Sequence, residues 1–149
     1  MTSNERALRA VRAQVQFELV QAGAEVAQAA TLAAEAQQEV AALTQNCESA
    51  THELRDAMGR PRINPALIDA MHRLYQVEYH RLQHAQGRLT TAQQREEQAR
   101  TALAGLRNRE RSLERALQAE RRKQQLKQQA IEVLRADDLW LQHTWRESP

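Results

Sequence analysis

The sequence predicts an all-α protein, a long antiparallel two-helix coiled-coil hairpin whose C-terminal helix is the longer one. Three observations lead to this fold class. Apolar residues recur with a seven-residue period along most of the 149 residues, one cluster of helix-breaking residues interrupts them, and Glu and Arg form complementary rows on either side of the break. Only 3% of the residues are aromatic, which favours a thin helix–helix interface over a thick globular core.

The break lies at residues 59–64 and contains the strongest helix-ending residues of the chain. Gly59 is expected to adopt the left-handed conformation that follows many helix ends, and Pro61 prevents the helix from continuing. Asn64 then provides an N-cap, with Pro65 at the first helical position. One turn therefore joins two helices.

Helix one is expected over about residues 3–58. Thr2 and Glu5 have the spacing of a capping box at its start. Two apolar columns then follow the heptad, as the core a and d positions of a coiled coil do. They are Leu19, Val26, Ala33, Val40, Cys47 and Leu54, and Leu8, Val15, Ala22, Ala29, Ala36, Leu43, Ala50 and Ala57. The many alanines predict a close approach of the partner helix.

Helix two is expected over about residues 65–146, with a heptad that polar residues interrupt. Its columns contain Leu82, Leu89, Leu103, Leu117, Ile131 and Trp145, and Ala85, Ala92, Ala99, Leu106, Leu113, Leu134 and Leu141. The interruptions are Glu96, Glu110, Glu120, Gln124, Lys127 and Asp138. Before Leu82 the pattern is expected to shift by about one residue, because an apolar stripe of its own precedes it: Leu67, Ala70, Leu74 and Val77.

Charges beside the core positions predict the antiparallel orientation. The g positions of helix one include Glu18, Glu25, Glu39 and Glu53, and those of helix two include Arg81, Arg88, Arg95 and Arg109. In an antiparallel coiled coil g faces g, so acid meets base along one edge. Such exposed pairs contribute only a few tenths of a kcal/mol each, and they select orientation more than they stabilise. Two neighbouring alignments satisfy the pairing equally.

The unequal helix lengths predict an unpaired C-terminal end from about residue 116. Its last part is apolar on more than one side and carries both tryptophans; its main apolar residues are Ile131, Leu134, Trp140, Leu141 and Trp145. Phe17 and Val20 of helix one form an outward stripe at the same end. An exposed apolar area of this kind usually marks a protein-binding site. The alternative is that the end folds back and covers Phe17 and Val20 itself.

A second apolar group lies near the turn. Met71, Tyr75 and Tyr79 follow helical spacing in helix two. They either widen the helix–helix interface there or form a second docking surface, and both interpretations remain open.

The sequence carries no recognisable catalytic, cofactor or metal site. His80 and His84 lie on one helical face, but further ligands at zinc spacing are absent, and Cys47 is a small core residue. The basic stretch 107–127 contains interleaved acids and no stacking aromatics, so nucleic acid is not an expected partner. A single cysteine, no signal-peptide core and no membrane-spanning run lead us to expect a cytoplasmic protein without direct membrane insertion.

In its length, its break at residues 59–65, its Ala/Gln/Arg/Glu heptads and its longer second helix, the chain resembles the stalk proteins of bacterial type III secretion, the FliJ and YscO type, including their Hrp-type members. The resemblance covers essentially the whole chain and concerns architecture, without a signature motif. It implies a non-enzymatic axle that inserts into a hexameric secretion ATPase and couples it to the export gate, with export chaperones as further partners.

The resemblance also implies where each partner binds. The ATPase end would include Leu8, Val15, Phe17, Val20, Ile131, Leu134, Trp140, Leu141 and Trp145, and the gate or chaperone end would include Met71, Tyr75 and Tyr79. The basic stretch 107–127 would meet acidic loops of the ATPase pore. The alternative function is a cytoplasmic coiled-coil scaffold or export chaperone that binds partner helices.

Overall fold

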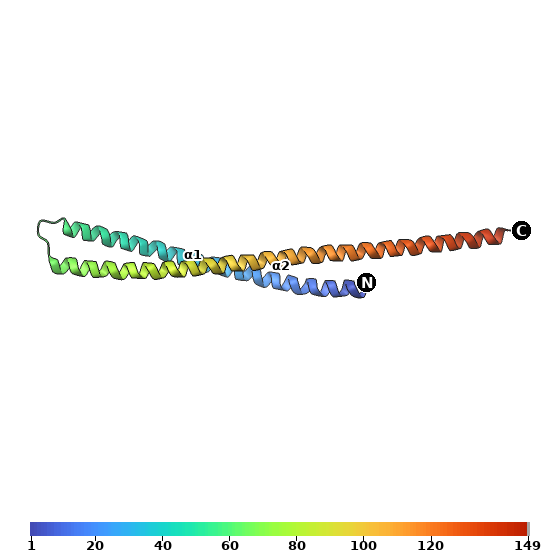
Figure 1. Ribbon diagram of the computed structural model, residues 1–149, viewed down its shortest axis with the longest axis horizontal. Coiled ribbons are helices and arrows are strands. Elements are labelled where there is room, and N and C mark those ends of the chain that lie inside the picture. The colour runs from blue at the N-terminus through green and yellow to red at the C-terminus, as the bar shows by residue number, and fades with distance from the viewer. Residues whose placement is uncertain (149) are drawn as a thin grey trace. The chain divides into compact units, whose positions relative to one another are not determined.

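The computed structural model describes residues 1–148 and consists of two long helices that pack together (Figure 1). Helix α1 is Ser3–Met58 and helix α2 is Pro65–Glu147. The described residues contain no strand. Both helices begin and end within one residue of the bounds that the sequence predicts.

Side-chain caps explain where the two helices begin. The Thr2 hydroxyl accepts a hydrogen bond from the backbone N–H of Glu5 at 3.2 Å. The Asn64 side-chain oxygen accepts from the N–H groups of Ala66 and Leu67 at 3.1 and 3.4 Å. Each cap satisfies backbone donors that the first helical turn leaves without a partner. The Asn64 cap is as predicted, whereas only the Thr2 half of the predicted capping box forms, because the Glu5 carboxylate contacts Arg9 and Arg121.

The predicted left-handed conformation of Gly59 is wrong, because no described residue has a positive φ. The N–H of Gly59 still donates to the carbonyl of Arg55 at 3.0 Å, so the last turn of α1 closes in the ordinary helical manner. Pro61, which has no N–H and a fixed φ, prevents α1 from continuing beyond its end at Met58 into the turn.

The described chain forms two compact units, residues 21–103 and residues 1–20 with 104–148. Each unit contains one segment of α1 packed on one segment of α2. The unit of residues 21–103 also contains the turn between the helices, an arrangement consistent with a hairpin (Figure 1).

Small side chains form the core of the unit of residues 21–103. The buried residues are Ala22, Ala33, Cys47 and Ala57 of α1 and Ala85 of α2. All of them belong to the predicted heptad columns. Because alanine extends only a methyl group from the helix, the two backbones approach closely where these residues meet.

The predicted shift of the heptad before Leu82 is wrong. Leu67, Leu74 and Val77 are 46%, 65% and 47% exposed, and Ala70 is exposed as well. The residues that face α1 lie one position further along the chain and are half-buried: Ile68, Met71, Tyr75 and Glu78. They continue the seven-residue period of Leu82 and Ala85 toward the turn without interruption, so α2 does not have to rotate about its axis to keep its contact with α1.

In the unit of residues 1–20 and 104–148, α1 covers more of α2 than the sequence predicts. Val15 is fully buried and Leu117 is 2% exposed. Glu120 and Gln124 are half-buried, and every described residue after Gln124 is exposed. The unpaired end thus begins near residue 125 instead of 116, and residues 125–147 are called the C-terminal tail below. None of the described helical stretches is both long and apolar enough to cross a lipid bilayer.

Candidate protein-binding surfaces

The C-terminal tail exposes a large amount of apolar surface. The five residues predicted there are between 45% and 80% exposed, and Trp145 is the most exposed of them: Ile131, Leu134, Trp140, Leu141 and Trp145. Leu126, Val133 and Leu139 are exposed too. Apolar side chains at this density on a helix without a partner in the described chain are typical of a protein-binding site.

These side chains form two faces of the tail helix. The first face continues the core positions of α2 and contains Ile131, Leu134, Leu141 and Trp145. The second face contains Leu126, Val133 and Trp140, which also repeat every seven residues. A helix with one partner needs one apolar stripe, so two stripes favour contact with more than one neighbouring element. The spacing of Leu126 from Val133 and Trp140 would have identified it as part of the surface.

The α1 residues predicted at this end divide into exposed and buried ones. Phe17 and Val20 are 59% and 75% exposed, and α2 remains one helix to Glu147, so the tail does not fold back over them. Val15 is fully buried and Leu8 is half-buried. These two therefore stabilise the contact between α1 and α2 and, as placed, present little or no surface to another protein.

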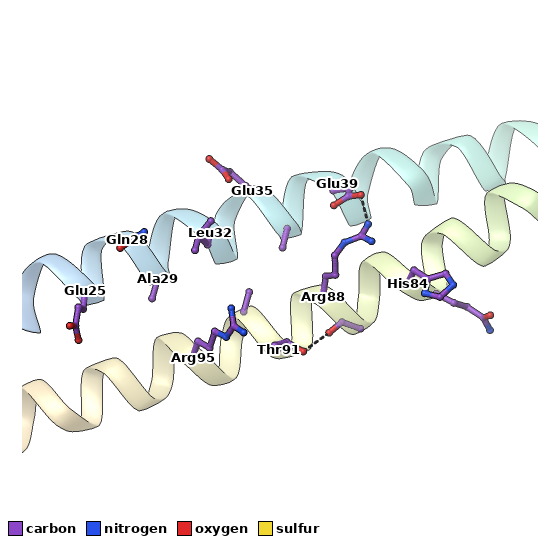
Figure 2. Close-up of a pocket in the computed structure, with 14 residues that line it drawn as sticks. Glu25, Gln28, Ala29, Leu32, Glu35, Glu39, His84, Arg88, Thr91 and Arg95 are labelled. Atoms are coloured by element: carbon purple, nitrogen blue, oxygen red, sulfur yellow. Dashed lines mark hydrogen bonds and ion pairs between the residues drawn. The ribbon is translucent and has the colours of Figure 1, made fainter.

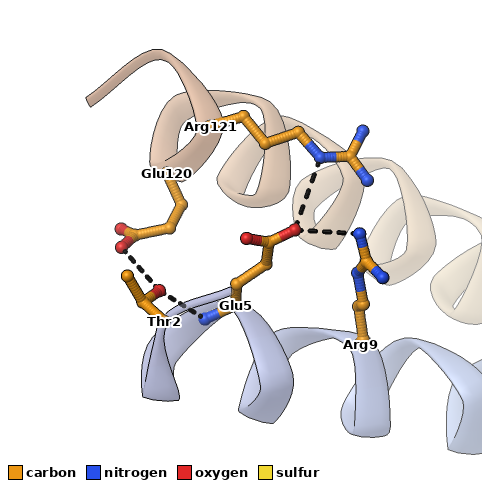
Figure 3. Close-up of polar contacts among 5 residues, drawn as sticks. All are labelled: Thr2, Glu5, Arg9, Glu120 and Arg121. Carbon is orange, nitrogen blue, oxygen red and sulfur yellow. Dashed lines mark hydrogen bonds and ion pairs between the residues drawn. The ribbon is translucent and has the colours of Figure 1, made fainter. Parts of the chain in front are cut away.

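A polar cluster ends the paired region just before the tail (Figure 3). The carboxylate of Glu5, only 6% exposed, accepts a hydrogen bond from Arg9 at 2.9 Å and lies 3.7 Å from the Nε of Arg121. The Thr2 hydroxyl donates to the Glu120 carboxylate at 3.2 Å. These contacts hold the start of α1 against α2.

The basic stretch 107–127 is partly engaged by acids of the protein itself. Arg121 lies against Glu5, and Glu114 of the same stretch pairs with Arg12 of α1 at 3.9 Å. Three acidic residues, Glu110, Glu114 and Glu120, lie among the basic side chains of this stretch, which makes it a poor match for a nucleic-acid backbone.

Near the turn, Met71, Tyr75 and Tyr79 divide between the helix–helix contact and the surface. Met71 and Tyr75 are half-buried, whereas Tyr79 is 43% exposed and its ring stacks on that of Tyr75 with centroids 6.1 Å apart. Met71 and Tyr75 thus widen the helix–helix contact. The exposed apolar stripe here is Leu67, Leu74 and Val77, which the sequence placed in the core.

Cys47 and Glu78 form a polar site inside the contact between the helices. Burial raises the pKa of the Cys47 thiol, and the negative charge of Glu78 raises it further. One oxygen of Glu78 accepts from Arg81 at 3.2 Å, while the other is buried and has no hydrogen-bond partner in the described residues. A thiol with a raised pKa stays protonated at neutral pH and is a poor nucleophile.

A groove of about 920 Å³ lies between the helices of the unit of residues 21–103 (Figure 2). Its lining combines Ala29, Leu32 and Gly87 with charged residues, among them the ion pair of Glu39 with Arg88. This is the one ion pair that joins the predicted Glu and Arg rows within residues 1–148. The groove is open and mixed in polarity, unlike an enclosed ligand cavity.

His80 and His84 lie on the α2 segment of the same unit, and the ring of His80 is 6.3 Å from that of Tyr79. Among residues 1–148 no three His, Cys, Asp or Glu side chains are placed to hold a metal ion. No protein-family model, curated protein or solved structure matches the chain.

Proposed function

We propose that this protein is a non-enzymatic, cytoplasmic stalk of a bacterial type III secretion apparatus, which inserts into a hexameric secretion ATPase and couples it to the export gate. One observation carries the proposal: α2 extends beyond its contact with α1 as an exposed helical tail, and Trp140 and Trp145 are exposed near the end of this tail. The architectural resemblance described above supplies the identity of the partner.

An antiparallel coiled coil is part of this proposal, and the contacts within each unit support it. In the unit of residues 1–20 and 104–148, Glu5 pairs with Arg121, and Arg12 pairs with Glu114. From the first pair to the second the α1 number rises and the α2 number falls, which supports an antiparallel arrangement. In the other unit, the groove brings residues 25–39 of α1 together with residues 83–95 of α2, and Cys47 lies near Glu78.

The mechanism we propose is mechanical. A two-helix rod has no rotational symmetry that matches a six-membered ring, so it contacts the subunits unequally and favours a different nucleotide state in each. A tail that contacts several subunits at once would also favour ring assembly, because it binds the assembled form. Neither effect requires a catalytic residue on this chain.

The test is to mix the full chain with the secretion ATPase of the same organism and to measure ATP turnover and ring formation. We expect both to rise with the wild-type chain. The variant Trp140→Ala/Trp145→Ala should lose the stimulation and remain helical, because both side chains are exposed. The matched control is Leu74→Ala/Val77→Ala, which removes exposed apolar groups near the turn and should stimulate like the wild type. Absence of binding and of any change in turnover or ring formation would rule the proposal out.

The second candidate is a coiled-coil scaffold or export chaperone that binds partner helices. The exposed stripe Leu67, Leu74 and Val77 favours it, because three apolar residues at helical spacing suit one face of a docking helix. In this case Leu74→Ala/Val77→Ala should lose binding of the client protein, and the ATPase should respond equally to all variants.

A further inference from the structure

Two charged residues interrupt the first apolar face of the C-terminal tail. Lys127 and Asp138 occupy the same heptad columns as the apolar residues of that face. Both are exposed, as is the whole tail. A charge at a core position destabilises a coiled coil unless the partner neutralises it, and for this reason such residues fix alignment and partner choice. A helix that covers this face must therefore present an acid to Lys127 and a base to Asp138.

We propose that this helix is the same tail of a second copy of the chain, paired antiparallel about a two-fold axis. In an antiparallel coiled coil, an a position of one helix faces a d position of the other. When Ile131 is placed opposite Leu134 of the second copy, Lys127 falls opposite Asp138 of the second copy. The two-fold axis repeats both pairs, so the contact contains two apolar layers at its centre with an ion pair on each side.

Other alignments of two tails leave the charges unbalanced. A shift by one heptad in one direction sets Leu134 of one tail against Asp138 of the other. A shift in the other direction sets Glu120 of one tail against Asp138 of the other, and Ile131 against Lys127. A parallel pair in register sets Lys127 against Lys127 and Asp138 against Asp138. Only the first alignment neutralises every charge at a core position between residues 124 and 141, and charge complementarity therefore selects it.

The start of α1 determines how far two tails can overlap. Gln124 is already half-buried in the unit that contains the start of α1, so the outermost available layer places Gln124 opposite Leu141. At 1.5 Å per residue the shared helix is about 27 Å long. The second face, with Leu126, Val133 and Trp140, stays exposed in this dimer. The inference does not rest on the proposed function, but the dimer covers Ile131, Leu134 and Leu141 of the first face, so a tail paired in this way can offer only its second face to an ATPase.

Sedimentation equilibrium of the full chain, up to about 0.2 mM, tests the dimer. The wild type should show a monomer–dimer equilibrium. Lys127→Glu and Asp138→Lys should each raise the dissociation constant of the dimer by about tenfold or more, because each sets like charges against one another. The double variant Lys127→Glu/Asp138→Lys should return the dissociation constant to within about threefold of the wild-type value, because it only reverses the direction of each ion pair.

The control Arg122→Glu makes the same change of charge as Lys127→Glu at an exposed position outside the core columns, and it should change the equilibrium by about twofold at most. Circular dichroism checks that all variants stay helical. A wild type that remains monomeric throughout the range overturns the proposal, and so does a dimer that the single reversals leave intact or that the double variant fails to restore. Trp140→Ala separates this proposal from the ATPase one, since it alters only the second face and should leave the dimer unchanged.

Discussion

The carboxylate of Glu5 on α1 lies 3.7 Å from the guanidinium of Arg121 on α2, and Glu5 is only 6% exposed. Glu5 also accepts from Arg9 and contributes the negative charge of the first turn of α1. A helix N-terminus favours such a charge. One carboxylate thus stabilises the start of α1 and its contact with α2.

Replacing Glu5 with Ala should lower the free energy of unfolding by about 1 kcal/mol, because the variant loses a charged hydrogen bond and a favourable helix-end charge. Urea denaturation followed by circular dichroism measures the change. Glu35→Ala, at an exposed position of the same helix, is the control and should stay within about 0.5 kcal/mol. Equal stability of the two variants would contradict the role given to Glu5.

Ala85 is fully buried, so a larger side chain there should separate the helices. We expect Ala85→Leu to destabilise the protein by about 1–3 kcal/mol, the usual result of forcing extra methylene groups into a close contact. Ala41→Leu makes the same substitution at an exposed position of α1. If both variants unfold at the same urea concentration as the wild type, the helices do not approach closely at Ala85.

The two stripes near the turn differ in a measurable way. Met71 is half-buried, and Met71→Gln should lower the free energy of unfolding by about 1 kcal/mol through lost apolar burial. Leu74 is 65% exposed, and Leu74→Gln should change it by about 0.5 kcal/mol at most. The opposite ranking of the two variants would mean that α2 is rotated by one residue at this point.

The Cys47 thiol should titrate above its ordinary pKa of 9.0 in the folded protein. The main cause is burial of the thiol, and the nearby negative charge of Glu78 is the second. As the pH rises above 9.0, the unfolded chain releases this proton first. The contribution of the buried thiol to stability is therefore complete below 9.0 and is lost as the pH rises through the folded pKa. The rate of alkylation by iodoacetamide against pH reports the folded value, since only the thiolate reacts. Glu78→Gln should move that profile to lower pH, and an unchanged profile would remove Glu78 as a cause.

The helix bounds were predictable because local chemistry determines them. The Thr2 and Asn64 caps act within three residues of their own position, and Pro61 excludes a helix whatever its surroundings. The heptad columns of α1 were also predictable, since nearly every core position carries an apolar residue.

The face of α2 near the turn was not predictable from hydrophobicity. The stripe ending in Val77 is wholly apolar, whereas the stripe that faces α1 contains Glu78. Apolar content alone therefore selected the stripe that lies one residue before the one that faces α1. The uninterrupted seven-residue period decides the outcome in the structure, because a shift would require α2 to rotate by about 100° within a few residues. The extent of pairing was underestimated for a related reason, since Glu120 and Gln124 are polar and yet half-buried.

The tail was predictable in outline because the helices differ in length, and Trp140 and Trp145 are exposed in it. The inclusion of Val15 in a protein-binding surface conflicted with its place in a core column, where it is fully buried.

The placement of the aromatic residues gives the protein an optical reporter that is specific to its C-terminal tail. Both tryptophans lie in the C-terminal tail, and both tyrosines, Tyr75 and Tyr79, lie in the unit of residues 21–103. Indole emission shifts to shorter wavelength when water is removed from the ring. An unlabelled sample therefore reports coverage of the tail through tryptophan fluorescence, and no indole of the unit of residues 21–103 contributes to that signal.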